Sequence, residues 1–233
     1  DEMAAKRVAT HSSGNHALSL SYAAGRRGIP CHVVMPRTAP EAKKAAVRGY
    51  GGIITECEPS TSSREAVFAE VEKETGAEFV HPYNDPRVIA GQGTVGLEIA
   101  QQCGELGVAP HQVLVCCGGG GLVSGSAVAL KHHLPDVRVH TVEPEDFDDT
   151  MRSLESGRRE RVADDARSIC DALQAHTPGK MTFEINRKLL GRGLTVSDAE
   201  VRRLLDEAHA EALILGRLAW TGHQPFRGAW VPA

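Results

Sequence analysis

The most informative segment of this sequence is Val113-Leu114-Val115-Cys116-Cys117-Gly118-Gly119-Gly120-Gly121-Leu122-Val123-Ser124-Gly125. Its first five residues suit a buried strand, and a helical pattern of alanine and valine follows the glycines at residues 126–130. Each glycine raises the entropy lost on ordering, so four in a row are favoured where the backbone must approach another group closely. A strand, a glycine loop and a helix N-terminus are together typical of an anion site, most often for phosphate. A tight connection without a ligand is the alternative interpretation.

The rest of the chain alternates between strand-like and helix-like segments with short connections. This alternation predicts an α/β fold with doubly wound parallel sheets. Its expected parts are a small α/β domain at residues 8–80, a partial large α/β domain at residues 85–213 and a tail at residues 214–233. Capping boxes are expected at residues 38–41, 62–65 and 197–200, and Gly91, Gly93 and Gly96 indicate close packing of the helix that carries them. The expected strands are residues 6–11, 31–35, 52–57, 78–81, 113–117 and 137–142, and the main expected helices are residues 17–28, 38–50, 62–76, 85–103 and 180–190.

Composition narrows the classes of protein and partner. The 26 basic and 30 acidic side chains give a net charge of −4, so no basic surface indicates nucleic-acid binding. No apolar run approaches the roughly 20 residues that a membrane helix needs, and we expect no membrane partner. The six cysteines are scattered without a CxxC pair, which favours small buried side chains in a reducing cytoplasm.

The segment Ser12-Ser13-Gly14-Asn15-His16 stands where the first strand gives way to a helix. Two hydroxyl groups, a carboxamide and an imidazole can face one ligand there, and the exposed N–H groups of the helix favour a carboxylate. A simple serine N-cap is the alternative, but it leaves Asn15 and His16 unexplained. Paired with the glycine loop, this segment predicts one carboxylate pocket and one phosphate pocket.

These residues resemble the fold type II pyridoxal-phosphate enzymes, in particular the group of serine racemases and serine/threonine dehydratases. The resemblance covers about residues 6–215, and its most specific motifs are SSGNH at residues 12–16 and GGGGL at residues 118–122. It implies the tryptophan synthase β-like fold, with two doubly wound domains, here incomplete. Residues 169–173 and 177–179 are more similar to the threo-3-hydroxyaspartate dehydratase branch than to serine racemase itself.

The resemblance also implies roles for individual residues. Asn15 is expected to hydrogen-bond the phenolic oxygen of the cofactor, and Ser13 to move a proton on the cofactor face opposite the Schiff-base lysine. Ser12 and His16 are expected to hold the substrate carboxylate, and Arg64 to lie near the distal end of the substrate, where it would suit the second carboxylate of hydroxyaspartate. The phosphate would be held by the loop residues Gly118, Gly119, Gly120, Gly121 and Leu122.

A divalent cation site is the remaining implication of the resemblance. Its expected ligands are the carboxylates of Glu143 and Asp149 and the backbone carbonyl of Phe147. Oxygen ligands favour magnesium, calcium or manganese over zinc, and we expect the ion to support structure. A solvated acidic loop is the alternative interpretation.

The implied activity is a pyridoxal-phosphate-dependent dehydratase, an ammonia-lyase acting on 3-hydroxyaspartate, serine or threonine to give a 2-oxo acid and ammonia. Alternatives are a racemase of the same family and an inactive fragment that only binds a phosphate ligand. A dinucleotide-binding domain is a distant alternative, because Glu143 lies 22 residues after Gly121, where a ribose-binding carboxylate belongs. The pattern Gly119-x-Gly121-x-x-Ser124, however, lacks the third glycine of that motif.

Both ends of the chain depart from the family pattern. No lysine here stands in the Schiff-base context, and Lys6 lies on the strand that leads into SSGNH, so we expect that lysine to lie outside this chain. We therefore expect the chain alone to show no turnover of these amino acids above the background of the free cofactor, and we expect the full-length protein to be a homodimer. Residues 214–233 fit nothing in the family, and an altered reading frame would explain this abrupt change. A separate departure inside the chain is Tyr83, which stands where serine racemase has an asparagine.

Overall fold

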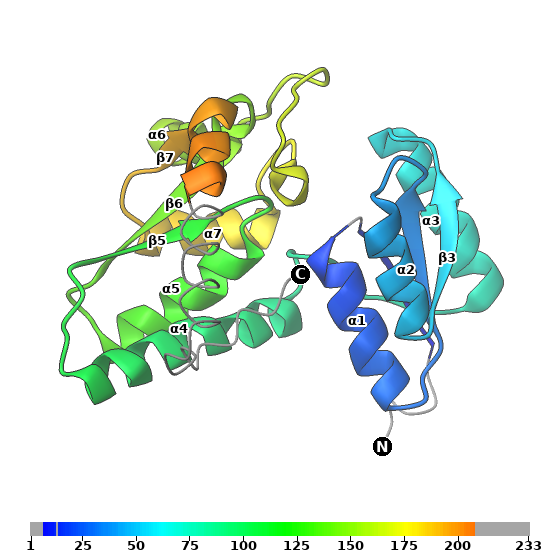
Figure 1. Ribbon diagram of the computed structural model, residues 1–233, viewed down its shortest axis with the longest axis horizontal. Helices are drawn as coiled ribbons and strands as arrows, with labels where there is room; N and C mark the ends of the chain where they lie inside the picture. Colours follow the sequence, from blue (N-terminus) through cyan, green and yellow to red (C-terminus); the bar gives the residue numbers. More distant parts are fainter. Residues whose placement is uncertain (1–6, 13, 208–233) are drawn as a thin grey trace, which may run out of the picture. The chain divides into compact units, whose positions relative to one another are not determined.

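The computed structural model describes residues 7–12 and 14–207, coloured along the sequence in Figure 1. The chain divides into two compact units, residues 1–195 and residues 196–233. The first unit contains nearly all of the described elements. None of the helices in the described ranges combines the length and the apolar character needed to cross a membrane.

The first sheet has four parallel strands in the order β3-β2-β1-β4. Side chains alternate along β2 (Cys31–Pro36), an inner strand of this sheet, so that Val33 and Met35 enter one core cluster and Val34 enters another. Both faces of the sheet are therefore buried, as expected of a parallel sheet. The strands are β1 (Val8–His11), β2 (Cys31–Pro36), β3 (Gly52–Cys57) and β4 (Glu78–Phe79).

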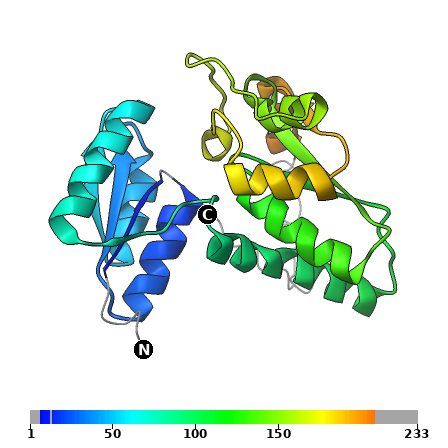
Figure 2. The same cartoon turned by 180° about the vertical axis from the view of Figure 1, so that it is seen from behind.

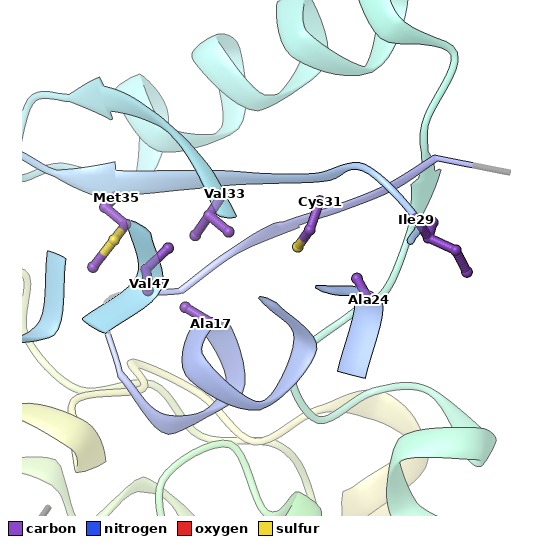
Figure 3. Close-up of a cluster of buried hydrophobic side chains, with 7 residues drawn as sticks. All are labelled: Ala17, Ala24, Ile29, Cys31, Val33, Met35 and Val47. Carbon is purple, nitrogen blue, oxygen red and sulfur yellow. The ribbon is translucent and has the colours of Figure 1, made fainter. Parts of the chain in front are cut away.

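Three helices cover the first sheet: α1 (Asn15–Arg26), α2 (Glu41–Gly49) and α3 (Thr61–Thr75). Ala17 and Ala24 of α1 and Val47 of α2 pack against the same face of β2, as Figure 3 shows. Phe68 and Val71 of α3 belong to the cluster on the other face, and Figure 1 shows α3 on the side of the sheet away from α1. The predicted doubly wound arrangement is confirmed.

Two of the three predicted capping boxes are wrong. Helix α2 has Pro40 as its N-cap, and no side chain caps it, so the expected cap at Thr38 is absent. Helix α3 begins earlier than expected, because Ser60 accepts a hydrogen bond from the amide of Ser63 and takes the capping position assigned to Ser62. The third box is confirmed within the second unit, where Ser197 Oγ accepts from the amide of Glu200 and the Glu200 carboxylate accepts from the amide of Ser197.

The second sheet has three strands in the order β5-β6-β7, and β5 and β6 run parallel. Cys116 of β5 is exposed and the following Cys117 is buried, so the two thiols lie on opposite faces as predicted. The chain from residue 86 onward forms α4 (Pro86–Leu106), β5 (Gln112–Cys116), α5 (Gly121–His133), β6 (Arg138–Pro144), η1 (Glu145–Phe147), α6 (Asp149–Ser156), η2 (Asp171–Leu173), α7 (Lys180–Leu189) and β7 (Leu194–Val196). The division of the chain near residue 80 into a small and a large domain stays a prediction.

Helices α4 and α5 lie side by side in both views (Figures 1 and 2). A Cβ atom on Gly96 would lie 2.4 Å from the carbonyl oxygen of Ser126, and one on Gly125 would lie 2.2 Å from that of Ile89. A Cβ atom on Gly93 would lie 3.3 Å from the carbonyl oxygen of Gly125, a tight contact, whereas one on Gly91 would have open space. The predicted close packing is therefore confirmed for Gly93 and Gly96 and is wrong for Gly91.

Candidate active site

The loop between β5 and α5 presents a row of free backbone N–H groups. The amide of Cys117 still bonds the carbonyl of Val142 in the sheet, but those from Gly118 to Val123 find no acceptor among the described residues. The last of them belong to the first turn of α5, which has no intrahelical partners for its amides. A helix N-terminus with such a row of donors is a cradle for an anion.

The carbonyl groups of the same loop, in contrast, have donors inside the protein. Gly119 O accepts from Thr182 Oγ1 at 2.8 Å and from the amide of Gly179 at 3.2 Å. Gly120 O accepts from the amide of Ser124 at 2.9 Å, which starts the hydrogen bonding of α5. The loop thus directs its negative ends into the protein and keeps its positive ends available, which is the polarity that a phosphate requires.

The glycines of the loop are needed for packing inside the protein. A Cβ on Gly119 would lie 2.4 Å from carbon atoms of the Tyr83 ring, and one on Gly121 would lie 2.9 Å from Tyr83 Cβ. Gly120 has φ of 93°, a region that side-chain-bearing residues avoid, and its Cβ would lie 2.9 Å from Thr182 Oγ1. The close approach inferred from the four glycines is therefore, at these three positions, an approach to Tyr83 and α7.

The loop between β1 and α1 offers side chains as well as backbone. Helix α1 begins at Asn15 with Gly14 as its N-cap, and no side chain caps it, so the alternative of a simple serine cap is not what the described residues show. Ser12 Oγ accepts from the amide of Gly14 at 3.3 Å, and Asn15 is exposed. The predicted catalytic residue Ser13 lies outside the described residues.

The imidazole of His16 is held by the sheet. Its Nε2 lies 3.1 Å from the carbonyl oxygen of Val80, which can only accept, so Nε2 carries the proton. Burial lowers the pKa of His16, and the bond to Val80 opposes that effect. A neutral ring in this tautomer leaves Nδ1 as an acceptor, which cannot donate a hydrogen bond to a carboxylate. The amides at the start of α1 are therefore better donors to a carboxylate than this ring is.

The turn η2 contacts both loops. A Cβ on Gly118 would lie 3.3 Å from Leu173 Cα, and one on Gly14 would lie 4.0 Å from Ala172 Cβ. Asp171 of the same turn pairs with Lys43 of α2. The described structure therefore brings the SSGNH and GGGGL segments to one short turn.

Arg64 lies on α3, with its Nε atom buried and without a hydrogen-bond partner among the described residues. The positive charge of Arg64 acts to lower the pKa values of His11 and of Tyr83. Burial, followed by this charge, lowers the pKa of His11 to about 4, whereas burial raises the pKa of Tyr83. An incompletely bonded guanidinium beside neutral rings is suited to a carboxylate.

Glu143 and Asp149 form a pair of buried carboxylates after β6. Glu143 is fully buried and accepts from the amides of Thr150 and Met151 at 3.0 and 2.7 Å, while Asp149 Oδ2 has no partner among the described residues. Burial raises the pKa of Glu143 to about 7, and burial together with the Glu143 charge raises that of Asp149 to about 8. Phe147 is buried beside them. No group of three or more His, Cys, Asp or Glu side chains in the described ranges could hold a metal ion.

Sequence reasoning missed the residues that support the glycine loop from behind, namely Tyr83, Thr182 and Asn186. Thr182 and Asn186 are fully buried, one helical turn apart, on either side of the buried Phe183. Polar residues four apart on the apolar face of a helix are the signal that identifies such a cluster. Tyr83 gives no local signal, because its contact depends on the fold.

Parallel α/β sheets with an anion cradle at a helix N-terminus define a class of phosphate-binding α/β proteins. Comparison with known proteins narrows this class, because a family model described as "Pyridoxal-phosphate dependent enzyme" matches residues 1–219. The chain belongs to this family of pyridoxal-phosphate-dependent enzymes.

Individual relatives agree with this membership. The chain is 54% identical over 202 residues to a beta-hydroxyaspartate dehydratase of Paracoccus denitrificans, covering 86% of this chain and 62% of the relative. It is 40% identical over 200 residues to the serine racemase of Arabidopsis thaliana, covering 86% and 59%. Each match therefore spans about three fifths of the relative's length.

Solved structures give the same result for the fold. The structure of maize serine racemase superimposes with a TM-score of 0.78 at 40% identity, covering 85% of this chain and 59% of that one. A threonine deaminase from T.th. superimposes with a TM-score of 0.80 at 43% identity, covering 86% and 65%. The predicted type II pyridoxal-phosphate fold is thereby confirmed.

Proposed function

We propose that this protein is a pyridoxal-phosphate-dependent dehydratase that releases ammonia from a β-hydroxy amino acid, with 3-hydroxyaspartate as the preferred substrate. The observation that carries the proposal is the glycine loop, whose amides from Gly118 to Val123 are free among the described residues while the Gly119 and Gly120 carbonyls have donors. This polarity suits the cofactor phosphate. The 54% identity to a beta-hydroxyaspartate dehydratase supports the choice of substrate.

The residues at the start of α1 are assigned to the reacting end of the substrate and the cofactor. Asn15 is exposed at the first position of the helix, where its carboxamide can donate to a phenolic oxygen. The amides of Asn15 and His16 have no acceptor among the described residues, and with Ser12 Oγ they can hold the α-carboxylate. When bound, pyridoxal phosphate supplies the electron sink that makes the α-proton of the amino acid acidic.

Arg64 is assigned to the second carboxylate of 3-hydroxyaspartate. Its buried Nε lacks a partner among the described residues, and burying a charged donor without a partner is unfavourable. A substrate carboxylate satisfies that donor and adds a charge-assisted hydrogen bond. Serine and threonine carry no second carboxylate, so this contact distinguishes the three substrates.

Glu143, Asp149 and the carbonyl of Phe147 are assigned to a divalent cation. Two buried carboxylates with raised pKa values need either protons or a cation to offset their charge, and Asp149 Oδ2 has no donor among the described residues. Oxygen ligands favour magnesium, calcium or manganese. The ion would then stabilise the connection between β6 and α6.

The test measures 2-oxo acid and ammonia released by the full-length holoprotein from threo-3-hydroxyaspartate, serine and threonine. We expect kcat/KM to be highest for 3-hydroxyaspartate. Arg64→Met should lower that value by about 10–100-fold, because a hydrogen bond to a charged group is worth about 1.5–3 kcal/mol, and should change the serine value little. Arg64→Lys keeps the charge and is the matched control. Equal losses on serine and 3-hydroxyaspartate would contradict the assignment of Arg64.

Racemisation is a second candidate, because the serine racemase of Arabidopsis thaliana is 40% identical over 200 residues. Racemisation needs a proton delivered on the cofactor face opposite the lysine, and we assign this step to Ser13. Ser13→Ala should therefore reduce the formation of the other enantiomer, followed by chiral chromatography, far more than ammonia release. Equal reductions in both would remove Ser13 from this role.

A further inference from the structure

A buried polar group of helix α7 lies directly behind the glycine loop. Thr182 and Asn186 are both fully buried, and Asn186 Oδ1 accepts from Ser124 Oγ of α5 at 2.8 Å. Thr182 Oγ1 lies 2.8 Å from Gly119 O and 3.2 Å from Gly179 O. Burial of these polar groups is unfavourable without such bonds, which hold Thr182 Oγ1 and Asn186 Oδ1 in place, whereas Asn186 Nδ2 has no partner among the described residues.

The bond from Thr182, together with the longer one from the Gly179 amide to the same carbonyl, orients the loop and its N–H groups. The C=O of Gly119 and the N–H of Gly120 belong to one planar trans peptide unit, in which they point in opposite directions. A donor that holds Gly119 O toward α7 therefore directs the Gly120 N–H away from α7. That N–H is one of the loop amides without an acceptor among the described residues.

The run of glycines makes a hydrogen bond that holds the loop backbone in one conformation especially important. A glycine has more backbone conformations to lose than any other residue, and the run from Gly118 to Gly121 gives the loop many alternatives to the anion-binding conformation. Tyr83 closes one side of the loop at Gly119 and Gly121, and Thr182 with Asn186 closes the side at Gly120. A binding loop that is ordered beforehand loses less entropy when its ligand binds.

We propose that Thr182 is a positioning residue for the cofactor phosphate and sets the affinity of the glycine loop for it through the hydrogen bond to Gly119 O. The proposal rests on the proposed function, because it takes the loop to be the phosphate site. It assigns a role to a side chain that lies 63 residues from its acceptor along the chain. The hydroxyl group acts on the ligand only through the loop backbone.

The test compares three ligands by equilibrium dialysis on the full-length holoprotein after removal of its cofactor: pyridoxal phosphate, pyridoxal without phosphate, and inorganic phosphate as a competitor. Thr182→Val removes the donor and keeps the volume. We expect it to weaken pyridoxal phosphate and inorganic phosphate by about tenfold, which corresponds to about 1.4 kcal/mol, and to leave pyridoxal unchanged. Thr182→Ser keeps the hydroxyl group and should retain the original affinities.

Thr141→Val is the matched control, because Thr141 is also fully buried and its hydroxyl has no partner among the described residues. It should leave all three affinities unchanged. Circular dichroism checks folding, and if Thr182→Val does not fold, Thr182→Ala removes the same donor without adding a methyl group.

Three results separate the possible failures. If Thr182→Val binds pyridoxal phosphate within twofold of the unaltered protein, the positioning role is overturned. If it weakens pyridoxal as much as pyridoxal phosphate, the effect is general and the role is also overturned. If the unaltered protein binds pyridoxal phosphate no better than pyridoxal, the proposed phosphate site itself is wrong.

Discussion

The two connections from a strand to a helix, β1 to α1 in the first sheet and β5 to α5 in the second, present polar groups to a ligand in different ways. Between β1 and α1 the chain presents the side chains of Ser12, Asn15 and His16. Gly14 has an ordinary φ of −138°, and a Cβ atom added there would meet only Ala172 Cβ, at 4.0 Å. Between β5 and α5 the chain uses backbone amides alone, and Gly120 sits at φ of 93° against Thr182 and Asn186. The first connection offers chemical variety and the second offers a fixed conformation.

Under the proposed function, this difference would let one fold combine a general cofactor site with a particular substrate. A backbone cradle recognises a phosphate whatever the rest of the ligand is, and its quality depends on what packs behind it. A loop of side chains changes its preference when one residue changes. We therefore expect substitutions in the two connections to have different kinds of effect.

The largest effect should come from Gly120→Val. A Cβ there would lie 2.9 Å from Thr182 Oγ1 and 3.0 Å from Asn186 Nδ2, and a β-branched residue is strained at φ of 93°. We expect pyridoxal phosphate retention to fall by more than about 100-fold, near 3 kcal/mol, in equilibrium dialysis. Gly14→Ala is the control in the other connection and should retain the cofactor, because its Cβ has room. Equal losses in both variants would show that the two connections do not differ as described.

The next effect concerns the buried carboxylates near the second sheet. Glu143 and Asp149 bind protons more tightly in the folded than in the unfolded protein, so without divalent cations stability should fall as pH rises from about 4 toward 8. The loss should amount to several kcal/mol, since each of the two pKa values is raised by more than two and one pKa unit corresponds to about 1.36 kcal/mol.

Thermal unfolding with a chelator and with magnesium measures this dependence. Asp149→Asn should flatten it, as should magnesium, whereas Glu145→Gln removes an exposed acid and serves as the control. A stability profile that Asp149→Asn leaves unchanged would contradict the account of the pair.

A smaller effect of opposite sign is expected in the first sheet. Burial and the Arg64 charge lower the pKa of His11 to about 4, so the unfolded protein binds the extra proton more tightly. Stability from this residue should be complete above pH 6.5 and should be lost as pH falls through about 4. His11→Phe keeps the ring beside Phe68 and Phe79 and should remove this acid-side loss, as seen in denaturant unfolding at several pH values. A steeper loss in the variant would contradict the assignment.

The smallest effect tests the helix starts of the first sheet. Ser60→Ala removes the bond from Ser63 N to the Ser60 side chain and should destabilise the protein by about 1 kcal/mol. Thr38→Ala should have little effect, because Pro40 is the N-cap of α2. Chemical denaturation of the two variants measures the difference, and a larger loss for Thr38→Ala would restore the cap predicted from the sequence.

The sequence predicts the parts of this fold that depend on local pattern. Alternating apolar residues locate the strands, and the glycine run locates the loop before α5. The caps of α2 and α3 were misplaced because several Ser and Thr residues stand near each helix start and only backbone geometry selects among them. Tyr83, Thr182 and Asn186 were missed because their partners lie 36, 63 and 62 residues away along the chain.

The contact between α4 and α5 has a consequence for motion. Where Gly96 meets Ser126 and Gly125 meets Ile89, the two helix backbones touch, so neither helix can slide or rotate without separating from the other. The pair should behave as one rigid body whose amides exchange slowly with solvent, and the glycine loop is attached to its end. Under the proposed function, an opening that admits an amino acid would then take place in the connections around this body, with the proposed phosphate site held still.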